Sequence, residues 1–215
     1  IGIFFEALSD ARKRKDSIQI SKIYNNLGSL YSEVNKDSIA LNYYIKALDL
    51  KIKLKNPVDI INGYFNLASI QEDIAYAEND SILLKEAEKN FLKTYELSKN
   101  SSYSQGIIIG LESLGNIARS KDFKLAEKRY TDLLNHSIKV NNQKYVATSL
   151  LHLGYLNNQE ENYKEALVYL EKAIPIAEEY SSEVIKLQLY SNLATAYYEV
   201  GNFKKSINYL ISQQN

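Results

Sequence analysis

The chain has 215 residues, of which 45% are hydrophobic and 24% are charged, a composition that is ordinary for a folded globular protein. Its 26 Lys and Arg residues balance its 26 Asp and Glu residues, so it lacks the basic excess of a nucleic-acid binder and we expect no direct contact with nucleic acid. The absence of cysteine excludes disulfides and thiolate metal sites and fits either the cytoplasm or the periplasm, and no apolar run approaches the ~20 residues of a membrane span.

Apolar residues recur at steps of three and four residues almost throughout, and only two prolines and eight glycines interrupt the pattern. This periodicity predicts an all-α chain. Residues 1–15 fit one leading helix, and the rest fits five successive helix pairs in a single repeat domain. The predicted pairs cover residues 16–55, 56–100, 101–141, 142–180 and 181–215.

Local signals mark several helix ends. Asp16 or Ser17 can cap the first helix of the first pair, and Asn56 followed by Pro57 is a cap with proline at the first helical position. Gly201 is predicted to stop the helix before it.

Two irregularities stand out. Pro175 falls inside a helix predicted over residues 163–179, which it should kink because it removes one backbone donor. The second pair carries seven extra residues, which we place in its inner turn, around residues 76–83.

Five short segments align with one another, each built on a leucine followed by Gly or Ala. The leucines recur about every 40 residues, which is the signature of a repeat architecture; they are Leu27, Leu67, Leu114, Leu153 and Leu193. A second signature follows each leucine, with a small residue, then a large one four residues later, as in Ala40 and Tyr44.

This pattern resembles the tetratricopeptide repeat over essentially the whole chain. The best matching positions are Tyr24, Leu27, Gly28 and Tyr31 in the first helix of a pair, helix A, and Ala40, Tyr44 and Ala47 in the second, helix B. The period exceeds the usual ~34 residues, so we expect helices about one turn longer, as in bacterial peptide-sensing regulators and kinesin light chains. The resemblance implies an alpha-alpha superhelix, a solenoid whose A helices line a concave groove. Within each pair, we expect the small residue of helix A to face the signature alanine of helix B.

The resemblance also implies which side chains point into that groove, by their register to the repeated leucine. These candidate partner-binding residues are Lys22, Asn25, Asn26, Asn62, Phe65, Asn66, Ile109, Glu112, Asn116, Arg119, Leu151, His152, Tyr155, Gln188 and Asn192. Asparagine precedes the leucine in three repeats, where its amide can pair with the backbone of an extended peptide, as in some family members. Alternatively, these amides pair with the neighbouring helix. The apolar side chains at the centre, such as Phe65 and Leu151, either anchor a partner or pack between repeats.

No pattern in the chain indicates catalysis. His136 and His152 fall on different helices, no cluster has metal-ligand spacing, and no nucleophile elbow or glycine-rich phosphate loop appears. We therefore expect no enzymatic activity, no metal and no cofactor. The family's cationic clamp for a peptide carboxylate needs Lys and Arg together in the groove, whereas Lys22 and Arg119 are far apart in sequence.

The sequence thus predicts a non-catalytic scaffold that binds a protein or peptide partner. One alternative is a regulatory input segment of a larger bacterial signalling protein, such as a histidine kinase or transcription regulator. Its motivation is the extended repeat, the Lys-, Asn- and Ile-rich composition and a leading helix that lacks its own helix A, which suggest that the parent protein continues at both ends. A further alternative is self-association into a homo-oligomer through the open repeat ends.

Overall fold

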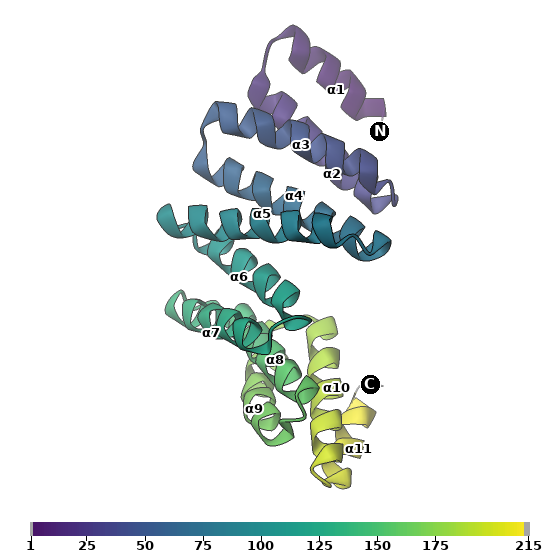
Figure 1. Ribbon diagram of the computed structural model, residues 1–215, viewed down its shortest axis with the longest axis vertical. Helices are drawn as coiled ribbons and strands as arrows, with labels where there is room; N and C mark the ends of the chain where they lie inside the picture. The colour runs from purple at the N-terminus through teal and green to yellow at the C-terminus, as the bar shows by residue number, and fades with distance from the viewer. Residues whose placement is uncertain (1, 213–215) are drawn as a thin grey trace. The chain divides into compact units, whose positions relative to one another are not determined.

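The computed structural model describes residues 2–212, and within them the chain forms eleven α-helices and no β-strand (Figure 1). In chain order the helices are α1 (Gly2–Lys13), α2 (Ser17–Glu33), α3 (Asp37–Leu54), α4 (Pro57–Glu78), α5 (Ser81–Asn100), α6 (Ser104–Arg119), α7 (Phe123–Lys139), α8 (Gln143–Gln159), α9 (Tyr163–Tyr180), α10 (Glu183–Glu199) and α11 (Phe203–Ser212). Turns of two or three residues join them, which favours antiparallel packing of consecutive helices. The predicted all-α fold of helix pairs is confirmed.

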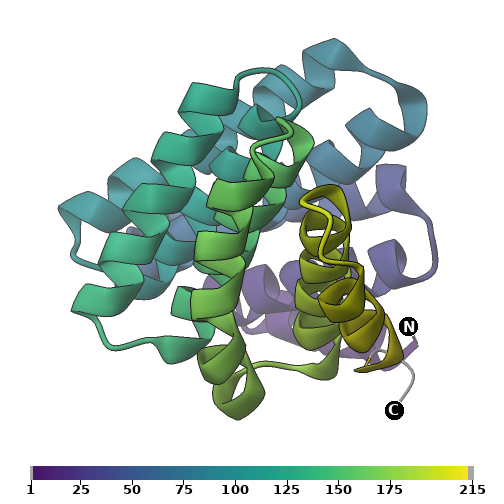
Figure 2. The ribbon, with the colours of Figure 1, turned by 90° about the horizontal axis from the view of Figure 1, so that it is seen from below.

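The helices group into two compact units, residues 1–110 and residues 111–215, whose boundary falls inside α6. In unit 1, each of α1 to α4 packs against the helix that follows it. In unit 2, consecutive helices from α7 to α11 pack in the same way, and the A helices α8 and α10 also contact each other. Helices α10 and α11 lie side by side in both views (Figure 1, Figure 2).

The repeat signatures supply the core of each unit. The repeated leucine and the signature alanine are buried in both, as at Leu27 and Ala40 in unit 1 and at Leu153 and Ala166 in unit 2. One helix pair cannot cover both of its faces, so neighbouring pairs must stack for these side chains to leave water.

Glycine in helix A allows close approach to helix B, but the atoms opposite it differ from the prediction. A Cβ on Gly28 would lie 2.8 Å from the Tyr44 ring, and a Cβ on Gly115 would lie 2.5 Å from Tyr130 Cε1. At these two positions the large residue of the second signature therefore faces the glycine, whereas at Gly154 both Leu170 and the backbone oxygen of the signature alanine Ala166 lie opposite it. A flat ring needs this room because a β-carbon on the facing helix would overlap it.

The predicted caps are confirmed. Asp16 accepts a hydrogen bond from the backbone N–H of Gln19 at 2.9 Å, and Asn56 accepts from Val58 and Asp59 at the start of α4. Gly201 follows α10 with a φ of +79°, the left-handed conformation that glycine adopts without strain.

The extra residues of the second pair do not lengthen its turn, which contradicts the prediction. Helix α4 ends 11 residues after its repeated leucine Leu67, whereas α2 ends six residues after Leu27. Helix α5 also starts earlier relative to its signature, and only Asn79 and Asp80 separate the two helices. Seven residues amount to about two helical turns, so they fit by extending both helices of the pair.

Pro175 lies inside α9, as predicted. It leaves one carbonyl of the preceding turn without its helical donor. The bend that this should cause stays a prediction.

Candidate functional site

The predicted groove residues all lie on A helices. Helix α2 carries Lys22, Asn25 and Asn26; α4 carries Asn62, Phe65 and Asn66; α6 carries Ile109, Glu112, Asn116 and Arg119; α8 carries Leu151, His152 and Tyr155; α10 carries Gln188 and Asn192. Leu151 is buried, whereas Lys22, Asn26, Arg119 and Gln188 are exposed and the others are partly buried.

In unit 2 the structure brings Glu112 of α6 and His152 of α8 together. His152 Nε2 lies 3.5 Å from Glu112 Oε1, and the two side chains are 18% and 26% exposed, so each remains partly accessible to solvent. The His152 ring stacks on Tyr130 of α7, with centroids 4.7 Å apart and planes 14° apart. The Tyr130 hydroxyl donates to Asn116 Oδ1 at 2.8 Å. Side chains of α6, α7 and α8 thus form one connected set of contacts.

Arg119 extends the same surface. Its guanidinium lies 4.9 Å from the centre of the Tyr155 ring, a cation–π arrangement across α6 and α8. We name the surface formed by Glu112, Asn116, Arg119, His152 and Tyr155 the α6–α8 face. It combines a carboxylate, an amide, a guanidinium and two aromatic rings.

In unit 1 the predicted asparagines of α2 and α4 meet. Asn25 Oδ1 accepts a hydrogen bond from Asn66 Nδ2 at 2.7 Å and a second from Lys51 Nζ at 3.1 Å. The Asn66 amide therefore pairs with the neighbouring A helix, as in the alternative interpretation.

Asn192 in unit 2 is also paired with a neighbouring helix. Its backbone oxygen and its Oδ1 accept hydrogen bonds from Asn158 Nδ2 of α8, at 3.0 Å and 3.3 Å. Its own Nδ2 donates to the backbone oxygen of Gln188. Of the three asparagines in this register, Asn26 alone is exposed.

The central apolar residues contribute to packing. Leu151 belongs to the buried core of unit 2, and the Phe65 ring lies 5.8 Å from the Phe91 ring of α5 at 57°. Phe65 is only half-buried, so part of its ring remains available to a partner.

Two residues that the sequence analysis missed, Lys51 and Tyr130, come from B helices. Each places a polar atom of its side chain against an A helix. The repeat register of the A helices could not identify them, because they lie on B helices. Lys51 carried a usable signal, because the equivalent residues of the other B helices are small: Ala11, Ser98, Ser137 and Ala177. Burial lowers the pKa of the Lys51 ammonium below its usual 10.5, and the Asp59 carboxylate opposes that shift.

Replacing Lys51 by Met is expected to stabilise the chain by about 1 kcal/mol at neutral pH, because an apolar side chain replaces a desolvated charge. The gain should shrink as the pH rises. Folded Lys51 loses its proton at a lower pH than the unfolded residue, so between its folded pKa and 10.5 the unfolded state binds more protons and wild-type stability rises relative to the variant. Urea denaturation of both proteins at pH 7 and pH 10 measures this difference. Lys53→Met is the control, since Lys53 is exposed and paired with Asp49. A gain that is equal at both pH values contradicts the expectation.

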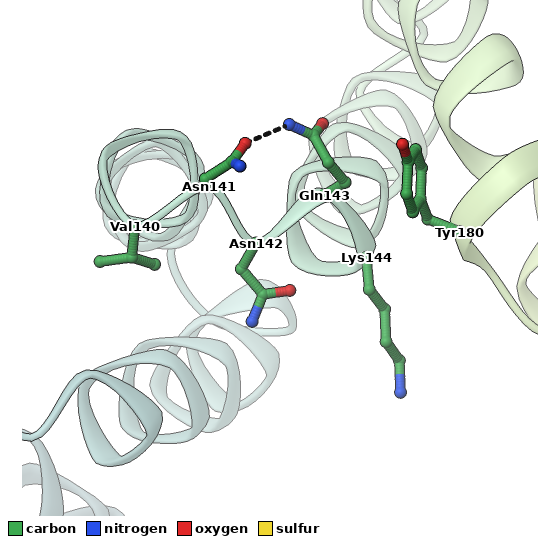
Figure 3. A pocket seen from close by; sticks show the side chains of 6 residues that line it. All are labelled: Val140, Asn141, Asn142, Gln143, Lys144 and Tyr180. Carbon is green, nitrogen blue, oxygen red and sulfur yellow. Dashed lines mark hydrogen bonds between the residues drawn. The ribbon is translucent and has the colours of Figure 1, made fainter.

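Three open cavities lie elsewhere on the two units and contain none of the predicted groove residues. The cavity in Figure 3, of about 480 Å³, lies at the turn between α7 and α8 beside Tyr180. In it, Gln143 Nε2 donates to Asn141 Oδ1 at 2.9 Å. The α6–α8 face is therefore a surface of contacts between side chains, separate from these cavities.

Neither a metal cluster nor a membrane-spanning helix occurs in the described part of the chain. Residues 2–212 contain no group of three or more His, Cys, Asp or Glu side chains placed to hold a metal ion. No helix among them is long and apolar enough to cross a membrane.

Helix pairs of this length, stacked in register with polar side chains on their A helices, define an all-α helical-repeat protein. Family models described as tetratricopeptide repeat match residues 21–54, which span α2 and α3, and residues 145–211, which span α8 to α11. These two matches support the assignment of the chain to the tetratricopeptide repeat family. A comparison with curated protein sequences gave no match.

Solved structures share the fold at low sequence identity. BtubC (BKLC) from P. vanneervenii is 18% identical with a TM-score of 0.84, over 99% of this chain and 87% of that one. A Rap protein complexed with competence and sporulation factor is 13% identical with a TM-score of 0.73, over 99% of this chain and 58% of that one. Aspartyl phosphate phosphatase F from Bacillus subtilis is 14% identical with a TM-score of 0.73, over 98% of this chain and 63% of that one.

Proposed function

We propose that this chain is a non-catalytic scaffold that binds a protein or peptide partner on its A helices. The observation that carries the proposal is the α6–α8 face. Glu112 accepts hydrogen bonds, Arg119 donates them and Asn116 can do both, so a polypeptide can find partners there for its backbone and its charged side chains. Tyr155 adds an aromatic surface of the kind that is common at interfaces.

The rigidity of this face also supports binding. The stack of His152 on Tyr130 and the bond from Tyr130 to Asn116 join side chains of three helices in the absence of a partner, and such contacts restrict their motion. Side chains that are already ordered lose less entropy on binding, so more of each contact appears as affinity. The Rap protein complexed with competence and sporulation factor shows that a related fold binds a partner.

Reversing the charge at Arg119 tests the proposal. Peptides are selected against the whole chain from a random display library, and their affinities are measured by calorimetry. We expect Arg119→Glu to weaken binding about tenfold or more, equivalent to about 1.4 kcal/mol. Lys172→Glu makes the same change of charge on an exposed position of the B helix α9 and should change the affinity less than about twofold. Equal effects of the two variants, or no effect of Arg119→Glu, would reject the α6–α8 face as the binding surface.

The regulatory and self-association hypotheses remain predictions. The sequence that flanks residues 1–215 in the intact gene tests the first, since a sensor or regulator would carry an output domain there. Sedimentation at high protein concentration tests the second, because a chain that associates through its repeat ends must show species larger than the monomer.

A further inference from the structure

We propose that unit 2 binds a guanidinium group on an aliphatic stem, in the cavity where the turn between α8 and α9 meets the C-terminal end of α10. This cavity has a volume of about 640 Å³, which lies within the range of small-ligand pockets. It contains no residue of the α6–α8 face, so this inference goes beyond the proposed function and can fail or hold independently of it.

The first observation is the charge of the lining. Glu161 in the turn, Glu165 in the first turn of α9 and Glu199 at the end of α10 line the cavity, together with a single lysine, Lys164. All four residues are exposed, and none of them forms an ion pair within the described part of the chain. The lining therefore carries a net negative charge, which attracts a cation.

A buried amide at the same cavity is an independent indication of a ligand. Asn157 of α8 is only 3% exposed, and its Nδ2 donates to the backbone oxygen of Leu153 at 2.9 Å. No residue in the range 2–212 donates a hydrogen bond to Asn157 Oδ1, yet this oxygen is not sealed within the core. It therefore faces the cavity that Asn157 lines, where the N–H of a ligand would supply the missing donor.

Comparison of the repeats shows that packing does not require an asparagine at position 157. Tyrosine occupies this position in the first and fifth repeats, and in the fifth the Tyr197 ring stacks on the Tyr209 ring with centroids 5.8 Å apart. The fourth repeat keeps the second ring of this pair, as Tyr169, but has Asn157 in place of the first. It thus lacks a ring stack and has an acceptor oxygen at the cavity instead.

The spread of the carboxylates selects an extended organic cation. Among residues 2–212, no group of three or more acidic or histidine side chains lies close enough together to hold one metal ion. A guanidinium carries its N–H donors on separate atoms of a planar fork, and it has more of them than an ammonium does. It can therefore donate to Asn157 Oδ1 and to a glutamate at the same time.

The rest of the lining suits the stem of such a ligand. Tyr163 and Val200 line the cavity together with the carboxylates. An arginine side chain packs its methylene groups against apolar surface, and its guanidinium stacks on aromatic rings. The Tyr163 hydroxyl already responds to the acidic surroundings, since desolvation and the carboxylates of Glu199 and Glu161 raise its pKa above the usual 10.0.

The first test titrates the whole chain with Nα-acetyl-arginine amide and follows the backbone amide signals of residues 161–163 by NMR. We expect saturable shifts, weaker binding of the lysine derivative, and no shifts with the citrulline derivative, which is the neutral isostere. The double variant Glu161→Gln, Glu199→Gln should weaken binding about tenfold or more, because it removes two exposed carboxylates. Glu160→Gln, in the same turn but outside the lining, should change the affinity less than about twofold.

Three results of this titration would overturn the proposal. They are equal binding of the citrulline derivative, equal effects of the double variant and of Glu160→Gln, and the absence of saturable shifts with both the blocked compound and free arginine.

Asn157→Tyr tests the buried acceptor. This variant gives the fourth repeat the residue of the first and fifth, so its ring should stack on Tyr169, occupy space at the cavity and abolish the shifts. If it does not fold, Asn157→Ala replaces it, since Ala118 occupies the equivalent position of the third repeat. Unchanged affinity in a folded variant would contradict the role of Asn157 Oδ1 and overturn the site.

Comparing free arginine with its blocked derivative distinguishes the two sources of the guanidinium. A site for an arginine within a polypeptide should bind both compounds equally, because only the side chain enters the cavity. A site for free arginine should lose about tenfold in affinity when the α-amino and carboxyl groups are blocked. Arg119→Glu should leave both affinities unchanged, so the failure of the α6–α8 face and the failure of this cavity are distinguishable.

Discussion

Tyr130→Ala is expected to lower the free energy of unfolding by about 3–5 kcal/mol, the range for removing a large aromatic side chain from a core. Tyr130 is fully buried, its ring lies against Gly115 and stacks on His152, and its hydroxyl donates to Asn116. Tyr130→Phe keeps the ring and removes only the hydroxyl, so it should cost about 1 kcal/mol. Urea denaturation of the three proteins gives these differences.

Tyr180→Ala provides the matched control. Tyr180 is 49% exposed at the end of α9, so its removal should change stability by no more than about 0.5 kcal/mol. Because repeat proteins can open in segments, amide hydrogen exchange should locate the loss in α6, α7 and α8. A Tyr130→Ala protein as stable as Tyr180→Ala would contradict the central role of this ring. The loss of its stack should also free the His152 side chain and weaken peptide binding at the α6–α8 face.

The features of the fold that depend on residues close together in the chain could be predicted from the sequence. The helices follow from apolar periodicity, and caps such as Asp16 and Asn56 act on residues within one turn of themselves. The repeat phase follows from the leucine spacing. The prediction that the inner turn of the second pair is longer was wrong. Aligning the repeats shows only that seven residues are inserted, and seven residues can extend two antiparallel helices as readily as they can extend a loop.

The use of each polar side chain could not be predicted in the same way. Asn66 pairs with Asn25, which lies 41 residues earlier, and Asn192 pairs with Asn158. Both contacts depend on how closely two A helices approach, which the register of one helix does not specify. Asn26, in the same register as Asn66, is exposed instead.

Lys51 is a case in which such a contact can be recognised from the sequence. The groove positions that the family resemblance implies lie on A helices. A prediction of binding residues from those positions therefore does not include a lysine of a B helix. An alignment of the B helices does reveal it, because a long charged residue occupies a position otherwise held by Ala or Ser. A residue that departs from the packing rule of its own repeat is a better indicator of a special role than one that merely lies in the expected register.

Gly154→Ala should cost about 1–3 kcal/mol, because the added carbon has no room. A Cβ on Gly154 would lie 2.4 Å from Leu170 Cγ and 3.3 Å from the backbone oxygen of Ala166. Leu170 is fully buried, so it has little space to move. This strain should exceed the ~1 kcal/mol by which Ala favours a helix over Gly. At Gly28 the nearest atoms belong to the half-buried Tyr44 ring, which can swing outward, so Gly28→Ala should cost less.

Thermal and urea denaturation compare the two alanine variants, and a double variant isolates the cause. If overlap with Leu170 is responsible, adding Leu170→Ala to Gly154→Ala should cost less than the two single changes together. Fully additive costs would show that Leu170 is not the obstacle. The strain can also be relieved by moving α8 away from α9, which would shift His152 and Tyr155 on the same helix. Gly154→Ala should therefore also weaken peptide binding at the α6–α8 face.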